Sequence, residues 1–395
     1  MKKYVLVVVF SLLSAVCMST GCNSNPNPIK DKKESVTNND IVSATNVPER
    51  DNGASAVDTL DFPKHFEADY SKLHFNTDIV VEEGADINNL YRFSGKRATY
   101  DMQKAYEKLT SNVHFEKTYE GEGIGEEGVP IPNMAYEGTN KEKMFLNGET
   151  LTFLTPWSNY ILRCVHPDSR DPRYNMDKYA LNGELEFMNK ENGYEQILLL
   201  LNDIGFKPEI DFQTVTYALN YSMLEQEEYN INMDGIEDTS KYKESWSEED
   251  NCYYYFIRQK VNGLPLYYVY GNVIKELDIC NSPVQVLYSK NGIQRLDIDK
   301  LFEIDDTADQ KLVSPLPLED LTQLMENQYE MLISDATFDV YKMELYMMAQ
   351  KNLQNTYDFF PVWIISMEQI QTENGQSVKT PMQAIIDAET GTIIS

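Results

Sequence analysis

Residues 123–128 read Gly-x-Gly-x-x-Gly, which is the spacing of a phosphate-binding loop. Such a loop needs open backbone amides at the start of a helix and no nearby anions. Here two glutamates stand inside the loop, and a Val-Pro-Ile-Pro segment follows at 129–132 in place of a helix. The sequence therefore predicts an acidic surface loop and not a phosphate site.

Cys164, His166 and Asp168 lie within five residues and are all potential zinc ligands. A zinc site needs three or four converging ligands, and no second Cys/His pair exists elsewhere in the sequence. We interpret this cluster as a strand end that leads into a loop.

Asn230, Asn232 and Asp234 alternate before Gly235, as in the first half of a calcium loop. The glutamate that closes such a loop is missing, because Lys241 stands at the twelfth position. Asparagine-rich turn chemistry explains the same residues. We predict no metal site and no cofactor, and the sequence leaves weak calcium binding open.

The absence of known catalytic motifs and the negative net charge each argue against a class of function. The chain has no G-x-S-x-G and no S-x-x-K motif, so no catalytic residue is predicted. An envelope hydrolase with an unrecognised pair of carboxylates remains the least favoured alternative. The 63 acidic against 34 basic residues give a net charge of -29, which excludes nucleic acid as a partner because its binding depends on lysine and arginine.

Six tyrosines between residues 253 and 270 fall in one predicted strand pair. Alternate residues of a strand face opposite sides, so half of these rings are expected to be exposed. We predict a binding face for sugars or proteins that contains Tyr254, Tyr268 and Tyr270 with Trp246 (Trp157 is a further candidate). The alternative is that these aromatic residues pack in the core, as their strand propensity allows.

The first 22 residues have the pattern of a secretory leader. Lys2 and Lys3 precede an apolar stretch at 5–16, and Ser19, Gly21 and Cys22 follow. This pattern resembles the bacterial lipobox, which implies removal of residues 1–21 and acylation of Cys22. Ordinary cleavage and an uncleaved anchor are the alternatives. Residues 23–60 contain no aromatic residue and predict a disordered linker between the anchor and the folded part.

Three cysteines remain after such processing: Cys164, Cys252 and Cys280. An odd number allows at most one disulfide within the chain. A bridge between Cys252 and Cys280 stays open, but the spacing matches no known framework and favours buried free thiols.

The fold class predicted from periodicity is α+β. A helix at 194–204 precedes strands at 216–224, 253–257 and 284–288, and a helix at 318–332 precedes strands at 338–348, 359–365 and 384–388. This order predicts two modules, each a helix on a three-stranded antiparallel sheet. The shared order suggests a duplication, but residue identity between the two halves is low and does not establish one. The expected divisions are a signal peptide (1–21), an acylated linker (22–60), a β-rich N-terminal region (61–185) and the two modules (186–310 and 311–395).

The residues Pro361-Val362-Trp363 and the segment 384–391 resemble the end of PepSY-like modules. The doubled arrangement behind an anchor is similar to the YycH/YycI regulators, and to uncharacterised clostridial-type lipoproteins grouped as a domain of unknown function. The resemblance implies an extracytoplasmic regulatory module and brings no catalytic residues.

These observations lead to one preferred function and one alternative. The chain is expected to be a lipoprotein on the extracytoplasmic face of the cell membrane that binds another envelope or membrane protein, without catalysis. The alternative is a protein that binds cell-wall glycan or peptide. The sequence names no small-molecule ligand.

Overall fold

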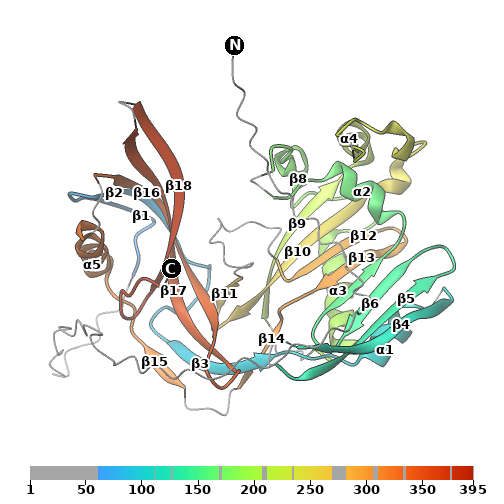
Figure 1. Ribbon diagram of the computed structural model, residues 1–395, viewed down its shortest axis with the longest axis horizontal. Helices are drawn as coiled ribbons and strands as arrows, with labels where there is room; N and C mark the ends of the chain where they lie inside the picture. The colour runs from blue at the N-terminus through green and yellow to red at the C-terminus, as the bar shows by residue number, and fades with distance from the viewer. Residues whose placement is uncertain are drawn as a thin grey trace, which may run out of the picture. The chain divides into compact units, whose positions relative to one another are not determined.

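The computed structural model describes residues 61–111, 113–125, 128–168, 171–206, 211–233, 235–268, 282–305, 310–331, 335–373 and 376–394 (Figure 1). The predicted leader and linker, including Cys22, lie outside these ranges, as do Tyr270, Asp234 and Cys280. The described residues belong to one compact unit, Asp58–Ser395. None of the described helices is long and apolar enough to cross a membrane.

Strands dominate the described part of the chain. Five α-helices accompany them: α1 (Met102–Leu109), α2 (Ser158–Cys164), α3 (Lys190–Asp203), α4 (Tyr221–Glu227) and α5 (Leu318–Glu330). The strands are β1 (His65–Asp69), β2 (Leu73–Val80), β3 (Leu90–Arg97), β4 (Phe115–Ile124), β5 (Pro130–Gly138), β6 (Lys143–Asn147), β7 (Leu151–Leu154), β8 (Ala180–Leu181), β9 (Asp211–Leu219), β10 (Cys252–Val261), β11 (Leu264–Tyr267), β12 (Val284–Ser289), β13 (Gly292–Ile298), β14 (Phe302–Asp305), β15 (Lys311–Val313), β16 (Thr337–Lys351), β17 (Tyr357–Glu373) and β18 (Gln376–Asp387).

One group of strands is entirely antiparallel, in the order β4-β5-β6-β7-β13-β12-β10-β9-β8. We call it the first sheet. Strand β10 lies inside it, paired with β9 on one side and β12 on the other. A two-residue turn then joins β10 to β11. Its residues, Asn262 and Gly263, both have positive φ, as a tight hairpin turn of this kind requires.

The second sheet has the order β1-β2-β16-β17-β18. Its β2 and β16 are parallel, so a strand near the start of the folded part lies beside one near its end. Strand β3 pairs with β17 and also with β14 and β15. Strand β11 pairs with β16 and so connects the two sheets through backbone hydrogen bonds.

Helices cover the sheets through apolar faces. Helix α5 places Leu321, Met325 and Tyr329 in one core with residues of the second sheet, such as Trp363. Helix α3 contributes Ile197 and further residues to a core on one face of the first sheet. Helices α2 and α4 belong to a separate core on its other face. A sheet covered on both faces buries both sets of alternating side chains. The tyrosines of β10 are therefore buried on whichever face they lie.

The predicted pair of helix-plus-three-strand modules is wrong. The fold is mostly β, and strands from the 61–185 region complete both sheets: β7 pairs with β13, and β2 pairs with β16. The predicted boundaries near 186 and 311 therefore cut through continuous sheets. Individual elements of the prediction are present, because α5 and β16 occupy 318–330 and 337–351. Long-range pairing, which periodicity does not report, sets the architecture.

Candidate functional site

A polar pocket of about 380 Å³ lies between strands β9 and β10 of the first sheet and strands β16 and β17 of the second. Its polar lining includes Gln213, Arg258, Ser282, Lys342, Glu344 and Ser366. Val215, Phe256, Tyr341 and Tyr346 complete the wall. We refer to these residues together as the polar pocket.

Alternation along β16 positions one side of the pocket. Met343, Leu345 and other apolar residues of this strand enter the core under α5. The intervening Lys342, Glu344 and Tyr346 therefore face the opposite side of the sheet, where they line the pocket. On the first sheet, Arg258 of β10 stands opposite Gln213 of β9, so the two side chains project from the same face.

Tyr341 is a β-bulge residue. Val340 and Lys342 pair with Met367 and Ser366, which are consecutive in β17, so Tyr341 is one extra residue in β16 at this point of the ladder. Bulges bend a strand and redirect side chains, and they are frequent next to functional sites. Here the bulge changes the alternation of β16, so that Val340 enters the core and Lys342 lines the pocket.

Four polar residues of the pocket are at least nine-tenths buried. Arg258 is 9% exposed, Glu344 7%, Ser282 6% and Ser366 4%. Arg258 donates from Nε to Ser282 Oγ at 3.4 Å, and Lys342 Nζ lies 2.9 Å from Glu344 Oε1. Transferring charged groups from water into a protein costs free energy unless other groups compensate. A cavity toward which a few buried polar and charged side chains converge is a candidate binding site.

Two buried phenols adjoin these charges. Desolvation raises the pKa of Tyr346 well above its usual value, and the nearby Glu344 carboxylate acts in the same direction. Desolvation also raises the pKa of Tyr267 to about 12, although the Arg258 guanidinium opposes this shift. Both phenols stay neutral at physiological pH. They can therefore donate hydrogen bonds, as Tyr267 does to Gln383 Oε1 at 3.3 Å.

No family model matches this chain, and neither does any curated protein. Solved structures do show a likeness. A crystal structure at 1.45 Å resolution of an uncharacterized protein from Eubacterium rectale ATCC 33656 superimposes with a TM-score of 0.54 and 15% sequence identity. The match covers 84% of this chain and 94% of that chain. At this identity the likeness shows a shared fold alone.

A second, shallower hollow of about 680 Å³ is lined by Glu67, Asp69, His74 and Asp339, among others. His74 Nδ1 is hydrogen-bonded to Asp69 Oδ1, and both side chains are exposed to solvent. Tyr341 lines this hollow as well as the polar pocket. The group is acidic and solvated, and no buried polar group is found among its lining residues.

The predicted aromatic binding face is not exposed. Tyr254 is 1% exposed, Tyr268 8% and Trp246 9%. Tyr254 donates its hydroxyl to Gln285 Oε1 at 2.8 Å, and Trp246 donates to Glu228 Oε2 at 2.9 Å. The expectation of exposed rings is wrong for these three residues, because Tyr254 and Trp246 pack in the core that includes residues of α2 and α4, and Tyr268 packs in the core that includes residues of α5. Tyr270 lies outside the described residues.

The metal-like motifs do not form ligand clusters among the described residues. Asn232 Oδ1 accepts a hydrogen bond from Ile236 N at 3.0 Å, so this carboxamide closes a local turn. Cys164 is buried, and desolvation raises the pKa of its thiol far above the usual value. Cys164 and Cys252 are both free and buried, as favoured from the sequence, while Cys280 is not described.

The glycine-spaced motif at 123–128 does not precede a helix. Gly123 lies in β4, and β5 begins at Pro130, so the motif bridges two antiparallel strands. Glu126 and Glu127 are outside the described residues. The arrangement agrees with the predicted absence of a helix after the motif, and it supplies no helix N-terminus for a phosphate.

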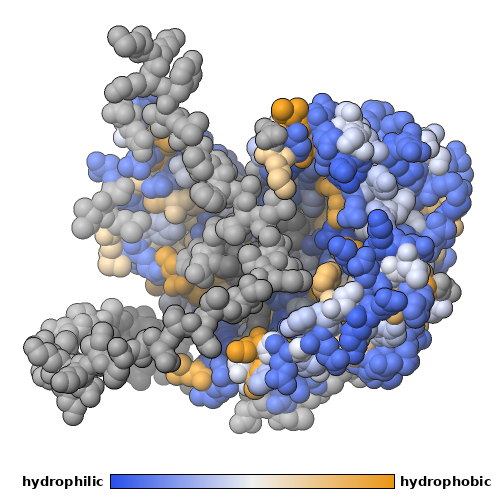
Figure 2. Space-filling view, turned by 45° about the vertical axis from the view of Figure 1, so that its right-hand side comes forward, coloured by the Kyte–Doolittle hydropathy of each residue, from blue (hydrophilic) through white to orange (hydrophobic). Residues whose placement is uncertain are grey.

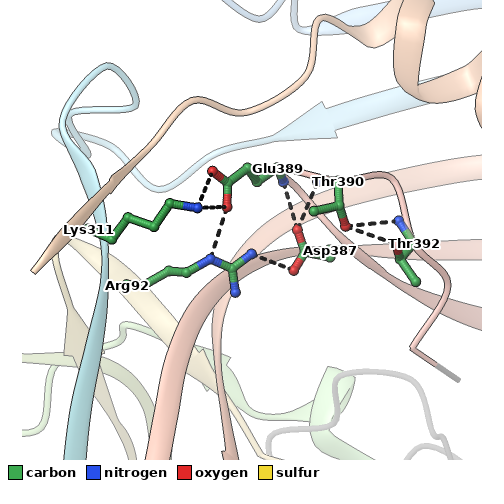
Figure 3. A network of polar contacts seen from close by, with 6 residues as sticks. All are labelled: Arg92, Lys311, Asp387, Glu389, Thr390 and Thr392. Atoms are coloured by element: carbon green, nitrogen blue, oxygen red, sulfur yellow. Dashed lines mark hydrogen bonds and ion pairs between the residues drawn. The ribbon is translucent and has the colours of Figure 1, made fainter. Parts of the chain in front are cut away.

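An ion-pair network fastens the end of β18 to β3 and β15 (Figure 3). Arg92 donates from Nη2 to Asp387 at 2.7 Å and from Nε to Glu389 at 3.0 Å, and Lys311 reaches Glu389 at 3.1 Å. Burial opposes the charged form of Arg92, but the hydrogen bonds to the two carboxylates outweigh it and raise the pKa of Arg92. Because each group in the network is partnered, we assign it a structural role.

Hydrophilic residues dominate the face shown in Figure 2, where apolar residues form small separate patches. Dispersed apolar residues of this kind are normal on a protein surface and do not define an interface. We take the polar pocket as the candidate site because it combines a cavity with buried charged side chains.

Proposed function

We propose that this chain is a lipid-anchored binding protein on the extracytoplasmic face of the cell membrane, and that the polar pocket holds a small polar ligand. The observation that carries this proposal is the near-complete burial of Arg258, Glu344 and Ser366 around one cavity. A volume of about 380 Å³ falls in the lower part of the range that small-ligand sites occupy.

Two features favour binding over the other functions considered. Glu344 is the one carboxylate among the described lining residues, so the pocket does not assemble the carboxylate pair that a typical glycoside hydrolase uses. Tyr254 and Tyr268 of the predicted aromatic face are buried and offer no platform on which a glycan could stack. A concave site that carries fixed charges suits a ligand that enters it. Such a protein would report ligand to an envelope protein and so serve as a regulatory module.

A tryptophan placed in the pocket should abolish ligand binding. Gln213 lines the pocket and is partly exposed, so Gln213→Trp adds volume into the cavity. The matched control is Gln323→Trp on the exposed face of α5. A panel of amino acids, short peptides, sugars and organic acids is screened by thermal unfolding. A ligand at one hundred times its Kd should stabilise the wild type and the control by about 2.7 kcal/mol, and leave Gln213→Trp unchanged. No stabilisation by any member of the panel, or equal stabilisation of all three proteins, contradicts the proposal.

The anchor is tested separately at Cys22. In the bacterial membrane, Cys22→Ala should lose incorporation of a labelled fatty acid and release the protein from the membrane fraction, since acyl chains supply the attachment. Cys164→Ala is the control, because that thiol is buried in the fold. Full labelling of Cys22→Ala would show that the lipobox assignment is wrong.

A further inference from the structure

The polar pocket has a charge opposite to that of the chain. The protein has a net charge of -29, yet the described lining carries two cations, Arg258 and Lys342, against one anion, Glu344. The neighbouring Lys260 and Glu82 pair with each other at 3.4 Å and add no net charge. The described lining residues therefore have a summed formal charge of +1. In a strongly acidic protein, the positive charge of such a pocket attracts an anionic ligand locally.

The geometry of the pocket indicates which kind of anion fits. The guanidinium of Arg258 is a planar fork of N–H donors, which matches a carboxylate or a phosphate. Its burial removes competing water and strengthens charge-assisted hydrogen bonds. Glu344 stands on the facing strand and acts as an acceptor, so it favours a ligand with an N–H or O–H group next to its anionic group.

We infer that the ligand presents one carboxylate to Arg258, as the free C-terminus of a peptide or an acylated amino acid would. This inference rests on the proposed function of the pocket. A single carboxylate offsets the +1 formal charge of the described lining residues. A phosphate monoester carries about -1.5 to -2 at neutral pH and would leave uncompensated negative charge beside Glu344. A peptide C-terminus also supplies an amide N–H close to its carboxylate, within the same small ligand.

The test uses two matched peptide libraries. N-acetylated tripeptides of mixed sequence are prepared with a free C-terminal carboxylate and, separately, as C-terminal amides. Each library is passed over the immobilised full chain, and retained members are identified by mass spectrometry and measured by calorimetry. The expected result is retention of free-acid members with at least about ten-fold tighter binding than their amides, which is the size of effect of a lost charge-assisted hydrogen bond.

Two variants of the pocket test where the carboxylate of the ligand binds. Arg258→Gln should weaken binding of the retained acids by about ten-fold or more, and Lys342→Gln, which lowers the lining charge to zero, should weaken it several-fold. Lys342 is 43% exposed, so this second variant keeps the test valid where Arg258→Gln fails to fold. Arg173→Gln, an exposed arginine paired with Asp171, is the control and should bind as the wild type does.

The possible outcomes distinguish a failure of the carboxylate inference from a failure of the proposed binding function. Equal retention of acids and amides by the wild type, with loss in Gln213→Trp, overturns the carboxylate inference and leaves the binding function standing. Inorganic phosphate that displaces the acids, and binds tighter than they do, also overturns it. If neither library is retained, the inference is overturned, and the wider ligand panel then decides the binding function on its own.

Discussion

Raising the pH above 10 should unfold this protein cooperatively, with its buried tyrosines ionising as the fold opens. The chain has 26 tyrosines, and many lie in the cores. Desolvation raises the pKa of Tyr253 and of Tyr267 to about 12. Desolvation shifts the pKa of several others still further in the same direction, namely Tyr100, Tyr179, Tyr255, Tyr268 and Tyr346.

The direction of this pH effect on stability follows because the folded protein favours the neutral form of these tyrosines. A tyrosine in the unfolded chain ionises near pH 10, whereas in the folded chain Tyr253 stays neutral until about pH 12. Its contribution is therefore intact below pH 10 and is lost progressively as the pH rises from 10 to 12. Every buried tyrosine whose pKa is raised in this way contributes stability that disappears over the same pH range. A typical domain is stable by only roughly 5–15 kcal/mol, so the combined loss from several such residues should unfold the protein.

The measurement follows tyrosinate absorbance and far-ultraviolet circular dichroism over the same alkaline titration. The two signals should change together in a steep transition above pH 10. Tyr119→Phe removes an exposed ring and should leave the transition unmoved. Tyr255→Phe removes one of the buried phenols and should move the transition to higher pH. A gradual titration of all rings with unchanged dichroism would contradict the prediction.

Local elements were predictable from the sequence because their signals are local. The helix predicted at 318–332 is α5, and the strand predicted at 338–348 lies within β16. The pairing of β2 with β16 joins residues more than 250 positions apart, and no periodicity encodes such a contact. The module prediction failed at this step. It assumed that each sheet is completed by strands from one continuous segment.

The predicted exposure of the β10 tyrosines rests on the wrong sequence pattern. Residues 253–257 read Tyr-Tyr-Tyr-Phe-Ile, which is a continuous apolar run and not an alternation. Such a run is typical of a strand that is buried on both faces. The observed pattern is full burial of Tyr253, Tyr254 and Tyr255. The prediction of an exposed face relied on period-two alternation in a segment whose composition already indicated otherwise.

The polar pocket could be predicted only in part. Lys342, Glu344 and Tyr346 alternate with Met343 and Leu345 in a predicted strand, which indicates one polar face. The sequence does not show what that face meets. Arg258 lies in another strand, and only the three-dimensional arrangement brings its guanidinium to the same cavity as Glu344. The bulge at Tyr341, which sets the phase of these residues, has no sequence signature of its own.

Replacing Glu326 with alanine should lower the free energy of unfolding by about 2–4 kcal/mol, because buried backbone donors lose their acceptor. Glu326 lies on α5 and is 3% exposed. Its carboxylate accepts hydrogen bonds from Lys72 N at 3.0 Å and Leu73 N at 3.0 Å, where β2 begins. Nothing in the local sequence of either segment suggests this contact, which fastens an early strand to a late helix.

Conservative and control variants make the Glu326 prediction specific. Glu326→Gln keeps one acceptor oxygen but turns an amide donor toward the backbone N–H groups, so it should cost an intermediate amount. Glu330→Ala, one turn later, removes an exposed hydrogen bond to Ser71 Oγ and should change stability by less than about 0.5 kcal/mol. Urea unfolding followed by circular dichroism measures all three variants. If Glu326→Ala is no less stable than Glu330→Ala, the carboxylate does not hold β2 against α5.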